Sequence, residues 1–127
     1  MKKYTNHKFD ENIVIALKAL AVPLMTFDNH FIYFEENKRK ESIYEHIANK
    51  KHRFCVSDIA CIPTILKDKN SLQQDKKKGI FRNYVGRRKK KNDKAKYIKI
   101  VTRLSKNCTE VVTSIYLIKE KIEKRIN

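Results

Sequence analysis

The hydrophobic pattern of this chain changes its period near the middle of the sequence. In the first half, apolar residues recur three and four positions apart, which is typical of amphipathic helices. From Ile80 onward, runs of β-branched and aromatic residues alternate in part with polar residues, which indicates strands. Helices followed by strands favour an α+β fold, with N-terminal helices packed on a C-terminal antiparallel β-sheet.

The N-terminal third predicts a helix and a hairpin. Asp10 supplies the N-cap of the helix, and Pro23 closes the segment because the residue before a proline is pushed out of the helical region. Leu24–Phe27 and His30–Phe34 then flank Asp28-Asn29, a two-residue turn signal between aromatic and branched residues. We therefore expect two short antiparallel strands here.

Two more helices are expected before the period changes. The second runs from about Glu41 to Lys50, where apolar residues are spaced one, three and four apart. Ser57 and Asp58 offer an N-cap and a first-turn acid for the third helix. Pro63 lies inside that helix and predicts either a kink or a restart, since proline removes a helical hydrogen bond.

Three strands are predicted in the second half, at Ile80–Val85, Tyr97–Arg103 and Glu110–Leu117. A loop from Lys67 to Lys78 precedes them. Residues 119–127 form a tail with isoleucines four apart, which is compatible with a short helix or a frayed end. One face of such a sheet can remain open to water.

The charge of the chain is strongly positive and unevenly distributed. Thirty Lys and Arg against 14 Asp and Glu give a net charge of +16. Fifteen basic residues against three acids lie between Lys67 and Arg103, so this segment holds +12 of the total. A compact domain with this charge repels itself unless a polyanion or salt offsets it. A polyanionic partner is therefore expected, and the alternative is a solvated lysine-rich surface without a specific ligand.

Composition excludes several functional classes. A length of 127 residues predicts a single domain spanning 1–127, and Gly79 and Gly86 alone cannot build a glycine-rich phosphate loop. Cys55, Cys61 and Cys108 are odd in number and lack metal-ligand spacing, so we expect no disulfide framework, no metal and no cofactor. No apolar stretch approaches the length of a membrane span. We expect a cytoplasmic protein with no membrane partner.

The polar residues suggest phosphodiester chemistry. Cleavage of RNA without a metal requires a base near the 2′-hydroxyl, an acid near the leaving oxygen, and donors for the developing charge. His46 and His52 are candidates, although a spacing of six puts them on different faces unless their helix ends between them. His7 and His30 have no candidate catalytic residues near them in the sequence and are interpreted as structural. Polar side chains that could converge on an open concave sheet face are Arg82, Tyr84, Lys99, Arg103, Thr113 and Ser114. The face to which Lys99 points depends on the strand register, which the sequence does not fix.

Short strings of residues resemble a known superfamily in their order along the chain. The strings are Glu45–Ile47, His52–Phe54, Asp58–Ile59, Ile62–Leu66, Phe81–Gly86, Tyr97–Thr102 and Glu110–Ser114. From about residue 41 to 116, the chain resembles phage-associated nucleases of the barnase/EndoU/colicin/RelE-like superfamily. In that superfamily the last strand often carries Val-Thr-Ser or Val-Thr-Ala. The resemblance implies the corresponding α+β fold.

The resemblance also implies an activity. It indicates a metal-independent ribonuclease, a toxin or phage effector, that cleaves transfer RNA or another RNA through a 2′,3′-cyclic phosphate. His52 is the first choice as proton carrier and His46 the second. Arg82 would contact the phosphate or the transition state. Thr113 and Ser114 would be positioning hydroxyls. Residues expected to bind nucleic acid are Arg53, Tyr84, Arg87, Arg88, Lys89, Lys99 and Arg103.

Other interpretations stay open at this point. A non-catalytic RNA- or DNA-binding module could use the same cations, with Phe81, Tyr84 and Tyr97 stacking on bases. An inactive member of the same fold is another interpretation. Asp28 with Glu36–Lys38 loosely resembles a magnesium-dependent restriction-type nuclease. RNA is the expected partner, and an acidic antitoxin or immunity-like protein could cover the same positive surface.

Overall fold

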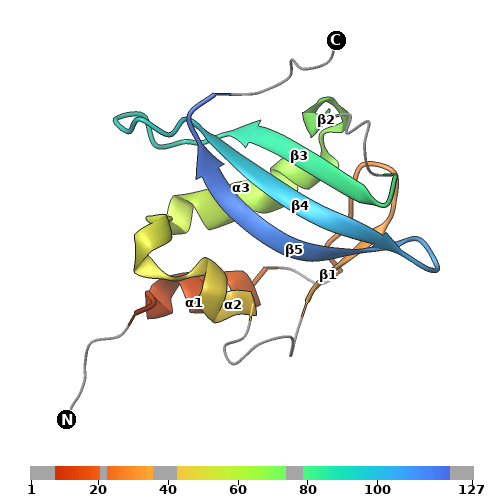
Figure 1. Cartoon of the computed structure of the whole chain (residues 1–127), viewed down its shortest axis with the longest axis horizontal. Helices are drawn as coiled ribbons and strands as arrows, with labels where there is room; N and C mark the ends of the chain where they lie inside the picture. The colour runs from red at the N-terminus through yellow and green to blue at the C-terminus, as the bar shows by residue number, and fades with distance from the viewer. Residues whose placement is uncertain (1–7, 21–22, 36–42, 74–78, 121–127) are drawn as a thin grey trace.

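A five-stranded sheet with helices on one side forms the structure. The computed structural model describes residues 8–20, 23–35, 43–73 and 79–120 (Figure 1). Its elements, in chain order, are α1 (Glu11–Lys18), β1 (Phe31–Phe34), α2 (Ile43–Ile47), the 3-10 turn η2 (Lys50–His52), α3 (Val56–Lys67), the 3-10 turn η3 (Lys69–Ser71), β2 (Leu72–Gln73), β3 (Phe81–Arg87), β4 (Tyr97–Ser105) and β5 (Thr109–Ile118).

The sheet is mixed rather than purely antiparallel. Its strand order is β1-β5-β4-β3-β2, and β1 runs parallel to β5 while every other neighbouring pair is antiparallel. The predicted α+β class is confirmed, and the prediction of an antiparallel sheet built only from the C-terminal half is wrong. β1 adds an N-terminal strand at one edge, and β2 adds a short strand within the segment predicted as a loop.

The turn that precedes β1 is confirmed, but the hairpin around it is minimal. Asn29 adopts a left-handed backbone with φ of 65°, which asparagine tolerates in tight turns. The predicted first strand makes an isolated bridge between Met25 and Phe31. Two backbone hydrogen bonds cross the hairpin, from the Thr26 N–H to the His30 carbonyl at 2.9 Å and from the Ile32 N–H to the Leu24 carbonyl at 2.8 Å. The opposite edge of β1 is instead paired with β5.

The helices begin close to their predicted residues. The Asp10 carboxylate caps α1 by accepting the Asn12 N–H at 2.9 Å, and the helix ends at Lys18, ahead of Pro23. Cys55, rather than Ser57, is the N-cap of α3, and the Asp58 carboxylate accepts the Cys55 N–H at 2.8 Å. The first-turn acid is therefore where it was predicted, although the cap lies earlier in the chain.

The third helix continues through its proline. α3 extends from Val56 to Lys67 with Pro63 inside it, so the helix does not restart there. Buried residues on both sides of the proline, Ile59, Ile62 and Ile65 among them, bind the helix to the rest of the core. Tertiary packing of an apolar face commonly outweighs a local breaker in this way.

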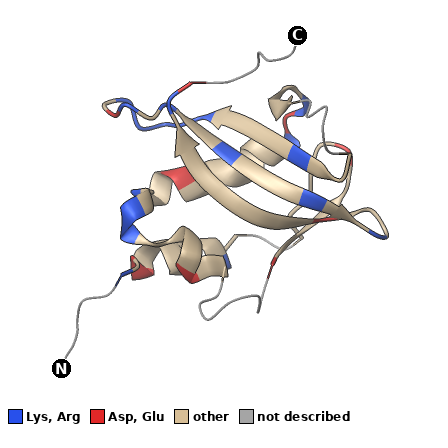
Figure 2. Cartoon of the chain, viewed as in Figure 1, with Lys and Arg blue, Asp and Glu red and all other residues tan. Residues whose placement is uncertain are grey.

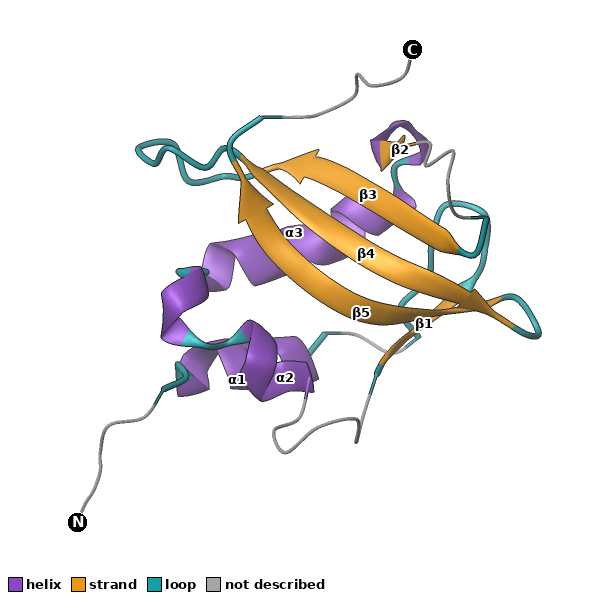
Figure 3. Ribbon diagram, viewed as in Figure 1, coloured by secondary structure: helices purple, strands orange, loops and turns teal. Residues whose placement is uncertain are grey.

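The core lies between the helices and one face of the sheet. In Figures 1 and 3, α3 runs behind β3, β4 and β5, and the described helices leave the front of these strands uncovered. Gly86 of β3 permits a close approach, because a Cβ atom there would lie 2.3 Å from Cγ1 of Ile65 in α3. Within the described residues, no helix has the length and apolarity that a membrane span requires.

Candidate functional site

Strand register divides the predicted polar residues between the two faces of the sheet. Arg82 pairs with Thr102, and Tyr84 pairs with Ile100, so both point to the helix-covered side. Lys99 and Arg103 have the opposite parity on β4 and point to the open side. The expectation that all these side chains converge on one face is wrong, because side chains alternate strictly along a strand.

On the covered side, Arg82 and Tyr84 join a polar cluster around a buried carboxylate. Glu110 has no exposed surface, yet its side chain accepts four hydrogen bonds. The donors are the Arg82 Nη1 at 2.7 Å, the His30 Nδ1 at 2.7 Å, the Tyr84 hydroxyl at 2.8 Å and the Thr102 Oγ1 at 2.7 Å. A buried carboxylate is tolerated when its acceptor sites are filled and opposite charge lies beside it.

Asp28 completes this cluster from the turn before β1. Arg82 Nη2 donates to Asp28 Oδ2 at 2.8 Å, and the Thr26 hydroxyl donates to Asp28 Oδ1 at 2.6 Å. The hydrogen bond from Arg82 holds the pKa of Asp28 well below its usual value. Burial raises the pKa of Tyr84. Arg82 thus bridges two carboxylates, and its guanidinium has its donors directed into the protein.

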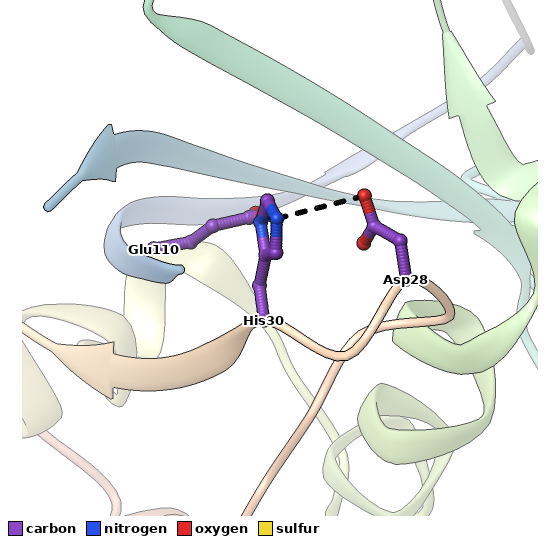
Figure 4. Close-up of side chains that lie close together, drawn as sticks. All are labelled: Asp28, His30 and Glu110. Atoms are coloured by element: carbon purple, nitrogen blue, oxygen red, sulfur yellow. Dashed lines mark hydrogen bonds and ion pairs between the residues drawn. The ribbon is translucent and has the colours of Figure 1, made fainter. Parts of the chain in front are cut away.

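Three members of the cluster have the donor atoms of a metal site. One ligand atom each from Asp28, His30 and Glu110 lies within 4.8 Å of the others (Figure 4). Both carboxylates are already bonded to Arg82, so a cation at this point would have to displace a guanidinium. The cluster fits a structural ion-pair network better than a metal centre. Glu36–Lys38, the other part of the magnesium interpretation, lie outside the described residues.

The open side carries a row of cations, aromatics and hydroxyls. At one end, Arg87 lies over the Tyr97 ring at 5.5 Å and donates to its hydroxyl at 3.3 Å. Two residues farther along β4, Lys99 Nζ lies 5.6 Å from the centroid of the ring of Tyr116, which is its cross-strand partner on β5. Arg103 follows farther along β4. We call this row the open-face row; its members are Asn83, Arg87, Tyr97, Lys99, Arg103, Ser114 and Tyr116.

A bulge in β5 separates the two predicted hydroxyl residues. Val101 pairs with Ser114, whereas the next residue of β4, Thr102, pairs with Val112. Thr113 is therefore the extra residue of the bulge. Its hydroxyl donates to the Val101 carbonyl at 3.3 Å, while Ser114 belongs to the open-face row. Sequence alternation alone does not reveal a bulge, so the two hydroxyls could not be assigned beforehand.

The two candidate histidines lie together. α2 ends at Ile47 and the chain continues through η2, after which Arg53 takes a left-handed backbone with φ of 64°. The ring centroids of His46 and His52 are 5.5 Å apart at an interplanar angle of 64°. A helix end between them was the condition for this meeting, and the structure fulfils it. Both residues are partly exposed, and α2 contacts β5.

Of the predicted nucleic-acid-binding residues, Arg88 and Tyr84 are buried. The Arg88 guanidinium makes two 2.8 Å bonds to Asp58 and lies 3.3 Å from Asp93. Tyr84 has no exposed surface, so its ring cannot stack on a base. Arg53, Arg87 and Lys89 are exposed, and Lys99 and Arg103 are partly exposed.

Known proteins do not identify the chain. No family model, curated protein or solved structure matches it. The nuclease resemblance in the sequence therefore stays a prediction.

The structure also assembles residues that sequence reasoning left apart. His30 and Glu110 are 80 positions apart and form a 2.7 Å hydrogen bond. One local signal indicated that Glu110 is buried. It lies two positions before the buried Val112 in the same strand, so both side chains point to the same face. An acid at a core position of a strand requires donors. Nothing local indicated that His30 and Arg82 would supply them.

Proposed function

We propose that this chain is a metal-independent endoribonuclease of the barnase/EndoU/colicin/RelE-like type, which cleaves RNA through a 2′,3′-cyclic phosphate. The observation that carries the proposal is the meeting of the His46 and His52 rings at 5.5 Å, in a segment whose helix contacts β5. Two imidazoles near neutral pH can serve as the base and the acid of one cleavage reaction.

The open-face row supplies the remaining chemistry. Lys99 and Arg103 of β4, together with Arg87 of β3, are strand cations on this face, where they can offset charge that develops on a phosphorus atom. Ser114 adds a hydroxyl within the same row. Tyr97 and Tyr116, each beside a cation, offer ring faces on which unpaired bases can stack. Arg82 has a structural part in this proposal, because its guanidinium binds Glu110 and Asp28.

The decisive experiment is digestion of total RNA in excess chelator. We expect the wild-type protein to cleave and to leave cyclic phosphate ends. His46→Ala and His52→Ala should each lower the rate by about 10²- to 10⁴-fold, since each removes a proton carrier. Lys69→Ala, an exposed change in η3, serves as the control and should retain the wild-type rate. Circular dichroism of each variant checks that the fold is kept.

Two results would contradict the proposal. Cleavage that chelator abolishes would favour the carboxylate interpretation through Asp28 and a divalent metal. Cleavage that survives both histidine changes would remove the assigned proton carriers.

A second function is favoured by the open-face row itself. Cations that lie beside partly exposed aromatics suit a non-catalytic RNA-binding module, whether or not the histidines act. In that case the wild-type protein binds RNA without cleaving it at any concentration, and alanine at His46 or His52 leaves the affinity unchanged. Alanine at Lys99 or Arg103 would still weaken binding, because the variant neutralises fewer phosphates and so releases fewer counterions from the RNA.

A further inference from the structure

The connection between β3 and β4 concentrates positive charge at one end of the sheet. Residues 88–96 contain Arg88 and five exposed lysines, with Asp93 as their single acid (Figure 2). They enclose a hollow of about 300 Å³ whose lining consists only of basic residues: Arg87, Arg88, Lys90, Lys91 and Lys96. We call this the basic hollow.

Buried contacts hold this connection in a defined shape. The Arg88 guanidinium, fully buried, binds Asp58 at the start of α3 and donates to the Ala95 carbonyl at 3.0 Å. The Arg88 N–H donates to the Lys96 carbonyl at 2.9 Å, and the Lys96 N–H donates to the Ile118 carbonyl at 3.1 Å. A binding loop whose conformation is already fixed loses less entropy when a ligand arrives.

The charges in the hollow are not equivalent. Asp58 and Asp93 lie beside Arg88, so the charge of this residue is compensated within the protein. The N–H of Ala95 and the Arg88 guanidinium hold the pKa of Asp93 below its usual value, which keeps this partner ionised. Lys90, Lys91 and Lys96 are exposed at the rim and are the charges that a ligand would meet.

The basic hollow lies near the histidine pair. Arg88 Nη2 is 3.9 Å from Cys55 Sγ, and Cys55 follows His52 by three residues. A three-residue span of chain separates its Cα atoms by at most roughly 11 Å. The positive charge of Arg53, the residue next to His52, also lowers the pKa of Asp93 in the connection. The two features therefore share one end of the molecule.

We propose that the basic hollow binds a backbone phosphate of single-stranded RNA, one that flanks the bond cleaved beside His46 and His52. The location of this phosphate beside the cleaved bond rests on the proposed function, whereas the binding of a phosphate by the hollow does not. Lysines give the hollow affinity for a phosphodiester without reading its sequence. Tyr97, bordering the hollow through its contact with Arg87, offers a ring face to the neighbouring base. Arg88 is a positioning residue that shapes the hollow from within.

The test is the salt dependence of binding to an RNA hexamer that carries 2′-O-methyl groups and cannot form a cyclic phosphate. We compare the wild type with the double variant Lys90→Ala/Lys91→Ala. The control, Lys67→Ala/Lys69→Ala, removes the same charge at the other end of α3. Removing the two lysines that neutralise this phosphate should reduce the slope of log K against log salt by about 0.7, the contribution of one neutralised phosphate of a single strand.

At low salt, the affinity of Lys90→Ala/Lys91→Ala should fall at least about tenfold, and the control should keep the wild-type slope. Lys90→Arg/Lys91→Arg should restore the slope because the charge returns. A DNA hexamer of the same sequence should show the same slopes, since backbone contacts do not read the sugar. A wild-type slope in Lys90→Ala/Lys91→Ala, or an equal loss in the control, would overturn the inference.

Failure of the inference and failure of the proposed function give different results. If the wild type does not cleave unmodified RNA but the slope changes as expected, the histidine assignment fails and the phosphate hollow stands. If the wild type cleaves and the slope does not change, the hollow is wrong and the ribonuclease proposal stands.

Discussion

At the scale of single residues, Glu110 has the most demanding environment in the described part of the chain. Its carboxylate is fully buried in β5, and four donors from two strands and the turn before β1 fill its acceptor sites. Removing one partner of a buried ion pair leaves a charge without compensation. The stability of the fold should therefore depend strongly on this one side chain.

Glu110→Gln should lower the free energy of unfolding by about 3–5 kcal/mol. The Arg82 guanidinium would stay largely buried but would lose one of the two carboxylates that neutralise it, and Asp28 would be the one that remains. Urea denaturation followed by circular dichroism measures this change. Glu120→Gln, at an exposed position after β5, is the matched control and should stay within about 0.5 kcal/mol of the wild type. A loss below about 1 kcal/mol for Glu110→Gln would show that the network contributes little.

The histidine pair shows how far residue types alone can predict a site. The residue types and their shared segment were enough to name His46 and His52 as candidates. Whether their rings could meet depended on where α2 ends, and helix ends are set by packing as well as by local signals. Their 5.5 Å separation follows from the end of α2 at Ile47 and from the turn η2 after it, which the residue types alone did not predict.

At the scale of elements, the contact between α3 and β3 explains why a glycine lies within a strand. Gly86 faces Ile65 so closely that any side chain would enter its space. Glycine normally weakens a strand, and a close backbone approach is one reason to keep it there. This contact also anchors the start of the basic connection, which begins two residues later with Arg88.

Gly86→Ala should therefore destabilise the protein by about 1–3 kcal/mol, the usual cost of forcing a methyl group into a packed interior. Gly79→Ala is the control, because a Cβ atom at Gly79 meets nothing within 4 Å. It should be neutral, or stabilising by at most about 1 kcal/mol through the unfolded chain. Thermal unfolding of the two variants in parallel decides the matter, and equal melting temperatures would mean that Ile65 moves aside at little cost.

Elements were predictable to the extent that their signals are local. β3, β4 and β5 lie within two residues of their predicted bounds, because alternating branched residues report a strand directly. β1 was expected to pair with its own hairpin partner, and its parallel pairing with β5 joins segments 78 residues apart in register. Neither this pairing nor the bulge at Thr113 has a local signature, so the division of polar residues between the faces remained hidden.

At the scale of the whole molecule, charge and ion pairing oppose each other. A net charge of +16 on 127 residues destabilises the compact state through self-repulsion. The two networks, around Glu110 and around Arg88, oppose this repulsion through ion pairs that are largely buried. Salt acts differently on the two effects, since exposed charges are screened far more than buried pairs.

Added salt should therefore raise the melting temperature. Going from about 0.01 M to about 0.1 M NaCl shortens the Debye length from roughly 30 Å to roughly 10 Å, which removes most repulsion between distant surface lysines. The buried pairs of Glu110 and Arg88 should weaken little over this range. We expect an increase of several degrees by differential scanning calorimetry, with an uncharged osmolyte at matched osmolarity as the control. A melting temperature that falls with salt would mean that exposed ion pairs, rather than these buried networks, dominate the electrostatic stability of the fold.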